Sequence, residues 1–91
     1  MADVIVTLKC VLASPDINVK ESTEKIRKEV ENFGARILGI TTEEVAFGIK
    51  AILPRFAMDE NLGNYDALED AIRDLDEVSS IETIQVSRAM G

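Results

Sequence analysis

The side chains that most often carry enzymatic chemistry are scarce in this sequence. Its 91 residues include no histidine and one cysteine, Cys10, so neither a nucleophile paired with histidine nor the usual zinc-ligand spacings can be formed. No GxxxxGK(S/T) or GxGxxG segment is available to hold a phosphate, and the many carboxylates have no metal-ligand spacing. We therefore predict no covalent catalysis, no cofactor and no metal, which leaves binding as the expected function.

The segment best suited to binding another molecule is EEVAFGIKAILP, residues 43–54. It is mostly apolar, yet it contains Gly48, a lone lysine at Lys50, and the aromatic Phe47 directly before the glycine. Such a segment is either a buried strand or a surface that meets another molecule. The predicted secondary structure around this segment bears on the choice between a buried strand and a binding surface.

Length and composition limit the remaining possibilities. A chain with 46% hydrophobic and 30% charged residues builds one small core, so residues 1–91 are expected to form a single domain. Asp3 and Lys9 interrupt the apolar run near the start, and no window is long enough to span a bilayer. We expect a soluble, cytoplasmic protein. Cys10 lies in an alternating apolar segment and is predicted to be a small buried side chain.

The net charge of −7 is concentrated in one segment. Residues 59–77 contain one basic residue, Arg73, and eight acidic ones: Asp59, Glu60, Asp66, Glu69, Asp70, Asp74, Asp76 and Glu77. Phosphate recognition needs clustered lysine and arginine, so the sequence predicts neither direct nucleic-acid binding nor attachment to an anionic membrane. Binding of RNA by a sheet surface would also need more aromatic residues than Phe47 and Phe56.

The first half of the chain predicts a strand, a helix and a second strand. Apolar residues alternate over 4–12, which is typical of a strand with one buried face. Asn18 precedes a helical pattern as an N-terminal cap with Glu21 three positions later, and Gly34 ends the pattern as a left-handed C-terminal cap. Residues 36–40 are predicted to be the second strand.

The second half repeats this order. Its predicted elements are a polar connection at 41–44, a strand at 45–56, a loop at 61–64, a helix with an apolar stripe over 65–75, a break at 79–80 and a last strand at 81–88. Two such units with right-handed crossovers form a ferredoxin-like α+β sandwich, a four-stranded antiparallel sheet with two helices on one face. The other face is expected to be solvated or covered by a partner, with Ile5, Val11 and Ile52 as candidate contacts.

This fold serves many unrelated functions, so the function depends on the segment identified above. Its residues Phe47, Gly48, Ile49 and Lys50 resemble the Phe-Gly-Ile-Lys motif of the guanine nucleotide exchange domain in the elongation factor 1-beta family. In that family the motif opens the third strand of a ferredoxin-like domain of similar size, after a polar connection and before an acidic helix. The resemblance covers essentially the whole chain and matches the build of the archaeal members.

The resemblance implies that the single domain is a guanine nucleotide exchange factor for elongation factor 1-alpha, the GTPase that delivers aminoacyl-tRNA to the ribosome. Such a factor binds the GDP form and favours the nucleotide-free state, so that GTP replaces GDP without any covalent bond changing. By resemblance, Phe47 inserts into a pocket of the GTPase, Gly48 permits close backbone approach, and Lys50 contacts the partner nearby.

The same residues also have purely structural interpretations. Phe47 would be a core residue at the entrance of a strand, Gly48 a β-bulge, and Lys50 a solvated charge that discourages edge pairing. Eukaryotic relatives carry a lysine near the chain end that enters the magnesium site. Arg88 is the candidate for that role here, although a planar guanidinium is a poor substitute for an ammonium. Alternatively, Arg88 only caps the last strand.

Two hypotheses of different class therefore remain: an exchange factor, or a ligand-sensing or self-associating module of the same fold. The second predicted helix has a stripe of like charge, with Asp66, Asp70 and Asp74 four residues apart. This stripe is either a solvated face or a surface that attracts a basic partner.

Overall fold

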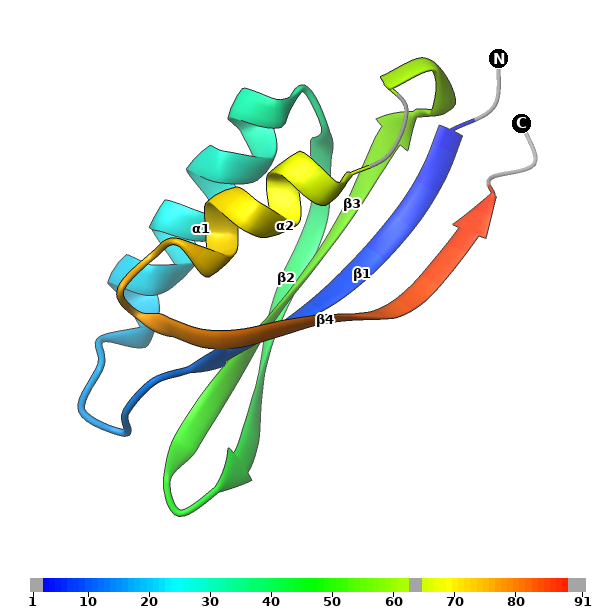
Figure 1. The fold of residues 1–91 in the computed structure, drawn as a ribbon. Coiled ribbons are helices and arrows are strands. Elements are labelled where there is room, and N and C mark those ends of the chain that lie inside the picture. The colour runs from blue at the N-terminus through cyan, green and yellow to red at the C-terminus, as the bar shows by residue number, and fades with distance from the viewer. Residues whose placement is uncertain (1–2, 63–64, 89–91) are drawn as a thin grey trace.

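The computed structural model describes residues 3–62 and 65–88. Its elements are β1 (Asp3–Leu12), α1 (Val19–Phe33), β2 (Arg36–Ala46), β3 (Ile49–Asp59), the 3₁₀ helix η1 (Glu60–Leu62), α2 (Asp66–Arg73) and β4 (Val78–Arg88). The strands form one antiparallel sheet in the order β2-β3-β1-β4, and both helices lie on the same face of it (Figure 1). This is the predicted ferredoxin-like α+β sandwich. Within the described part of the chain, no helix is long and apolar enough to cross a membrane.

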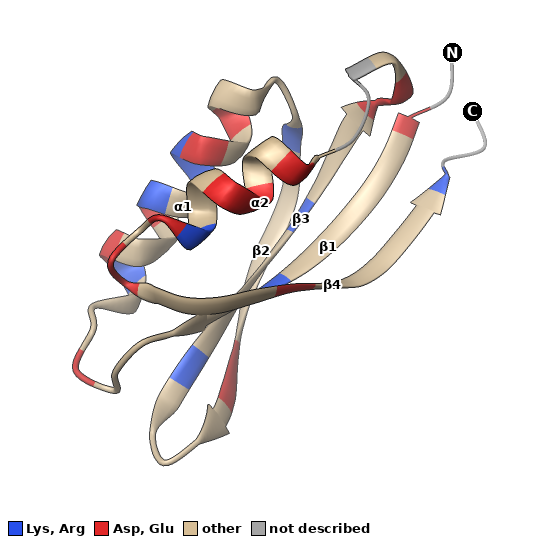
Figure 2. Ribbon diagram, in the orientation of Figure 1, with Lys and Arg blue, Asp and Glu red and all other residues tan. Residues whose placement is uncertain are grey.

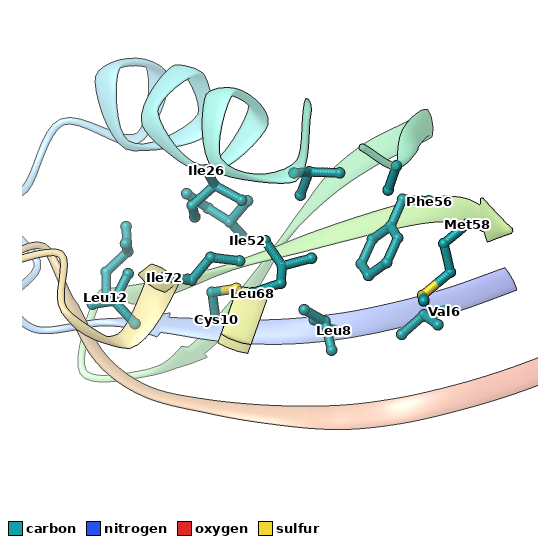
Figure 3. Close-up of a cluster of buried hydrophobic side chains, with 13 residues drawn as sticks. Val6, Leu8, Cys10, Leu12, Ile26, Ile52, Phe56, Met58, Leu68 and Ile72 are labelled. Carbon is teal, nitrogen blue, oxygen red and sulfur yellow. The ribbon is translucent and has the colours of Figure 1, made fainter. Parts of the chain in front are cut away.

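Side-chain alternation along β1 decides which face of the sheet is buried. Every second residue of β1 points toward the helices and meets apolar side chains of β3, α1 and α2 (Figure 3). This core includes Val6, Leu8, Cys10, Leu12, Ile26, Val30, Ile52, Phe56, Met58, Leu68 and Ile72. Burial raises the pKa of the Cys10 thiol to about 12, so the thiol stays protonated. Cys10 is therefore the small buried side chain that the sequence predicts.

The helix α1 begins and ends where the sequence predicts. The Asn18 side-chain oxygen accepts a hydrogen bond from the Glu21 backbone N–H at 3.0 Å. At the other end Gly34 has a φ of 101°, a conformation that glycine adopts without the steric cost of a Cβ. The Gly34 N–H donates to the Glu31 carbonyl at 3.0 Å. Both ends thus satisfy backbone groups that the helix itself leaves unpaired.

The predicted connection at 41–44 is wrong. These residues lie inside β2, and the chain reverses only at Phe47 and Gly48, so the third strand begins at Ile49 instead of 45. Residues 41–48 are all exposed, and a strand without a buried face needs no apolar alternation to form. Polar composition was therefore no sign of a loop here.

Other boundaries in the second half also differ from the prediction. The helix α2 ends at Arg73, and β4 begins at Val78, so residues 79–80 belong to a strand and do not break the chain. The predicted loop at 61–64 begins within η1, and residues 63–64 lie outside the described residues.

Ile52 is a further correction, because it was expected on the uncovered face of the sheet. Its register partner on β1 is Cys10, so its side chain lies on the helix side and is fully buried. Ile5 and Val11 do lie on the opposite face, where both are half-buried. One residue of error in strand register exchanges the two faces, and the glycine at position 48 obscured where β3 begins.

Glu77 ties the connection between α2 and β4 to two other elements. Its backbone carbonyl accepts a hydrogen bond from the Ala13 N–H at 2.9 Å, and its carboxylate forms an ion pair with Lys25 of α1. The hydrogen bond and the charge of Lys25 lower the pKa of Glu77. In return, the hydrogen bond and charge of Glu77 raise the pKa of Lys25.

We predict that Glu77→Gln lowers the free energy of unfolding near neutral pH. The folded-state pKa of Glu77 is below its unfolded value, so the stabilisation is present above the ordinary glutamate pKa of 4.5 and is lost as the pH falls below it. Urea unfolding at neutral and acidic pH measures the difference, which should shrink in acid. Glu31→Gln, an equal charge change at an exposed position of α1, is the control. Equal neutral-pH midpoints for the two variants would contradict the prediction.

Candidate protein-binding site

The end of the β2–β3 hairpin projects beyond the helices (Figure 1). We call residues 41–50 the hairpin arm. Residues 41–48 are all exposed, and the arm is held by its ladder, which pairs Thr41 with Leu53 at one end and Ala46 with Ile49 at the other. Because no helix covers the arm, its side chains are available to another molecule.

Phe47 and Gly48 form the two-residue turn at the tip of the arm. Their φ values are 54° and 78°, and two consecutive positive values are typical of the type I′ turn that fits the twist of a hairpin. Asn-Gly is the usual pair in this turn. A bulky residue with positive φ is uncommon and costs about 1–2 kcal/mol. The Phe47 side chain is nevertheless 95% exposed, so packing inside the domain does not offset that cost.

The structural interpretation of Phe47 as a core residue is therefore wrong. The interpretation of Gly48 as a bulge is wrong too, because the two irregularities of the β2–β3 ladder fall between Ile37 and Gly39 and between Glu44 and Ala46. The positive φ of residue 48 favours glycine there. Space is not the reason, because a Cβ at position 48 would lie 3.5 Å from the Cβ of Pro15, which is an ordinary contact. The exposed Pro15 in the loop after β1 thus borders the tip.

Lys50 lies near the start of β3 and pairs across the hairpin with Glu44. The Lys50 Nζ lies 3.9 Å from the Glu44 Oε2, and the lysine side chain is 42% exposed. The pairing of β3 with β1 ends at Val11 and Ala51, so Lys50 lies just beyond the part of β3 that β1 covers, and its interpretation as a solvated charge at a strand edge stays a prediction. A long surface ion pair of this kind contributes about 0–1 kcal/mol, so Lys50 can exchange Glu44 for another carboxylate at low cost.

The C-terminal end of β4, whose last residue is Arg88, lies at the opposite end of the molecule from the arm (Figure 1). Arg88 lies opposite Val4 of β1, and its Nη2 lies 3.3 Å from the Glu60 Oε2. Pro15 borders the tip just beyond the other end of β1. At about 3.3 Å per residue the two ends of β1 are separated by roughly 30 Å. The structure thus brings Phe47, Gly48 and Lys50 together and leaves Arg88 apart from them.

Sequence reasoning missed two residues near the tip, Pro15 and Val45. Pro15 belongs to a Ser-Pro-Asp segment that indicates only a turn, and its place beside Gly48 depends on tertiary structure. Val45 is 44% exposed, although its type favours burial. Its position within the arm, beyond the helices, explains the exposure, and the misplaced start of the third strand concealed it.

These features define a class of protein. The domain is a small ferredoxin-like sandwich whose uncovered hairpin arm presents an aromatic side chain. The backbone of this residue has an unfavourable positive φ, and residues in such conformations cluster at functional sites. A projecting side chain suits insertion into a cavity of another macromolecule. The geometry therefore suits a protein-binding module.

The chain belongs to the family described as the EF-1 guanine nucleotide exchange domain, whose model matches residues 5–89. Its relatives include proteins named elongation factor 1-beta. That of Methanocaldococcus jannaschii is 37% identical over 89 residues, covering 98% of this chain and 100% of the relative. That of Methanococcus vannielii is 37% identical over 87 residues, covering 96% and 98%. That of Halorubrum lacusprofundi is 32% identical over 88 residues, covering 97% and 99%. The predicted resemblance is confirmed, and membership supports a role in nucleotide exchange during translation elongation.

Solved structures with lower identity share the fold alone. The 30S ribosomal protein S6 from Thermotoga maritima matches with a TM-score of 0.69 at 17% identity, covering 90% of this chain and 86% of that one. The ACT domain from GTP pyrophosphokinase of Chlorobium tepidum matches with a TM-score of 0.64 at 19% identity, covering 90% and 99%. Both agree with the ferredoxin-like architecture.

We predict that Phe47→Asn raises the free energy of unfolding by about 1 kcal/mol, because asparagine tolerates positive φ and the exposed ring contributes little packing. Chemical denaturation of parent and variant measures the change. Phe47→Ala keeps a Cβ at the same φ and should leave stability nearly unchanged. A loss of stability in the asparagine variant would show that the ring packs against the domain.

Proposed function

We propose that this domain is a guanine nucleotide exchange factor for elongation factor 1-alpha and promotes the replacement of GDP by GTP without covalent chemistry. The observation that carries the proposal is the exposed Phe47 held at positive φ on the hairpin arm. Family membership supports exchange as the activity, and the archaeal relatives named elongation factor 1-beta support translation elongation as its setting.

Exchange requires a difference in affinity between two states of the GTPase. A factor that bound the GDP form and the nucleotide-free form equally would not change the fraction of GTPase that holds GDP. Phe47 therefore has to gain more contact in the nucleotide-free form. Burying an aromatic ring yields about 1.5–3 kcal/mol, and the short turn presents the ring with little loss of backbone freedom on binding. Lys50 and the close approach permitted by Gly48 would hold the tip in register.

Arg88 would contact a different region of the GTPase. Its side chain is 71% exposed and has Glu60 as a surface partner, so the guanidinium can leave that ion pair at a cost of about 0–1 kcal/mol. In the proposed complex this cation approaches the magnesium and phosphate site while Phe47 binds roughly 30 Å away. Contacts at two separate points, Phe47 and Arg88, would favour one relative position of two parts of the GTPase over others. A single contact would not do so.

The alternative of a ligand-sensing module is less well supported. The hollow between the helices has a volume of about 180 Å³, whereas small-molecule sites typically occupy about 300–1,000 Å³. No specific feature of residues 3–62 and 65–88 favours a metabolite over a protein partner.

We predict that Phe47→Ala slows exchange by about ten- to hundredfold while the domain stays folded, because the burial of one ring is lost. The measurement is the release of a fluorescent GDP from archaeal elongation factor 1-alpha with substoichiometric amounts of this protein. Leu38→Ala, which truncates an exposed apolar side chain of β2 outside the arm, should leave the rate near that of the parent. Unchanged release with Phe47→Ala would reject the proposed insertion.

For Arg88 we predict that Arg88→Gln slows GDP release in the same assay, whereas Glu60→Gln does not. Both variants break the same ion pair, but only the first removes the cation that the GTPase would meet. If the ion pair mattered only for the end of β4, the two variants would change release equally, and that result would remove Arg88 from the mechanism.

A further inference from the structure

The hollow between the two helices is shallow and lies on the helix layer, whereas the hairpin arm projects beyond the helices (Figure 1). The hollow is lined by Glu29, Asn32, Phe33, Ala67, Leu68 and Ala71, and its volume is about 180 Å³. Phe33 and Leu68 give it an apolar base, and two alanines one turn apart keep the α2 side low. For comparison of volume alone, a closed apolar cavity of about 150 Å³ accepts a benzene ring. The hollow therefore has the size of a single leucine or phenylalanine side chain.

Carboxylates border this hollow. Successive residues of a helix are rotated by about 100°, so Asp70 and Asp74 project beside Ala67 and Ala71 on the outer side of α2. Both aspartates are exposed, and most of the charged residues of α2 are acidic (Figure 2). From α1, Glu29 lines the hollow directly. An apolar depression with an acidic rim is therefore present on the helix layer.

Two of the basic side chains near the hollow already have acidic partners, and the exposed Lys28, one turn before Asn32 on α1, has none among the described residues. Arg73 pairs with Asp70 at 3.0 Å, and Lys25 pairs with Glu77. Helical rotation directs Arg27 to the side of α1 opposite Glu29, where it pairs with Glu24. The rim thus keeps an excess of negative charge that an incoming cationic segment would complement.

We propose that the hollow between α1 and α2 docks a cationic amphipathic helix of a protein partner. One leucine or phenylalanine of that helix would fill the hollow over Phe33 and Leu68, and its lysine and arginine side chains would meet Glu29 and Asp74. This is the helix-in-groove mode of recognition, in which an apolar anchor supplies affinity and flanking charges fix orientation. The acidic rim disfavours anions and nucleic acid. Because the hollow lies on the helix layer, it leaves the hairpin arm free.

The test uses a fluorescein-labelled helical peptide with a leucine and phenylalanine four residues apart and with lysine and arginine at the remaining positions. A peptide of the same composition with the two apolar residues on opposite faces is the comparison. Fluorescence anisotropy with this protein alone should show saturable binding of the first peptide, at least about tenfold tighter than that of the second, a difference of about 1.4 kcal/mol. Equal binding of the two peptides, or no binding of the first, would overturn the proposal.

Substitutions in this protein separate the hollow from general charge attraction. Ala71→Leu fills the hollow at a half-exposed position and should weaken binding at least about tenfold, with unfolding measurements confirming that the fold is kept. If that variant unfolds, Ala67→Leu at an exposed position replaces it. Glu29→Gln should weaken binding more than Glu31→Gln, the same charge change on the other side of α1. Equal effects of these two variants, or unchanged binding after the hollow is filled, would contradict the assignment.

This binding does not rest on nucleotide exchange, and one variant keeps the two apart. Phe47→Ala should bind the peptide as tightly as the parent even though its exchange activity is expected to fall. Weaker peptide binding by Phe47→Ala would show that the peptide occupies the hairpin arm, and would overturn the assignment to the helix layer while leaving the proposed exchange function untouched.

Discussion

The burial of one face of β1 against the two helices is the constraint on which the rest of this structure depends. Val6, Leu8, Cys10 and Leu12 supply one row of the core, and β3 and β4 must pair with β1 in a register that continues that row. Residues 41–48 lie outside the region covered by the helices and are all exposed. These residues make up most of the hairpin arm, and their side chains are therefore free to serve another purpose.

The arm separates stability from binding within one small domain. A domain with a core of this size has a modest free energy of unfolding, and a non-glycine residue held at positive φ lowers it further. The strained residue, Phe47, lies in a turn that contributes no side chain to the core, so the strain does not disturb the packing of β1 and β3. Gly48 limits the strain to one residue, because the second turn position also requires positive φ and glycine adopts it freely.

Much of the fold could be predicted from local patterns. The alternation over residues 4–12 and the Asn18 and Gly34 caps depend on near neighbours in the chain, and each is confirmed. The turn at 47–48 could not be placed, because Phe-Gly lacks the asparagine that normally marks a type I′ turn and because an uncovered strand has no apolar period to detect. The same limitation hid the boundary of β4, whose serines at 79–80 indicated a break.

For the candidate site, the sequence supplied residue types but not their arrangement. A motif could single out Phe47, Gly48 and Lys50, yet the exposure of the ring and its positive φ are properties of the folded chain. The separation of Arg88 from the tip also depends on the sheet order, since it is β1 that spans the distance between them. Pro15 could not be found from sequence at all, because it is 33 residues away from Gly48 along the chain.

The position of β1 in the sheet also bears on how the chain folds. Its two neighbours are β3 and β4, and Val4 of β1 lies opposite Arg88 of β4, 84 residues further along the chain. Both edges of β1 are therefore paired only after a long stretch of polypeptide has been brought back to it. Closing a long loop costs conformational entropy, and contacts this distant in sequence slow folding, so we expect the pairing of β1 with β4 to be a late step.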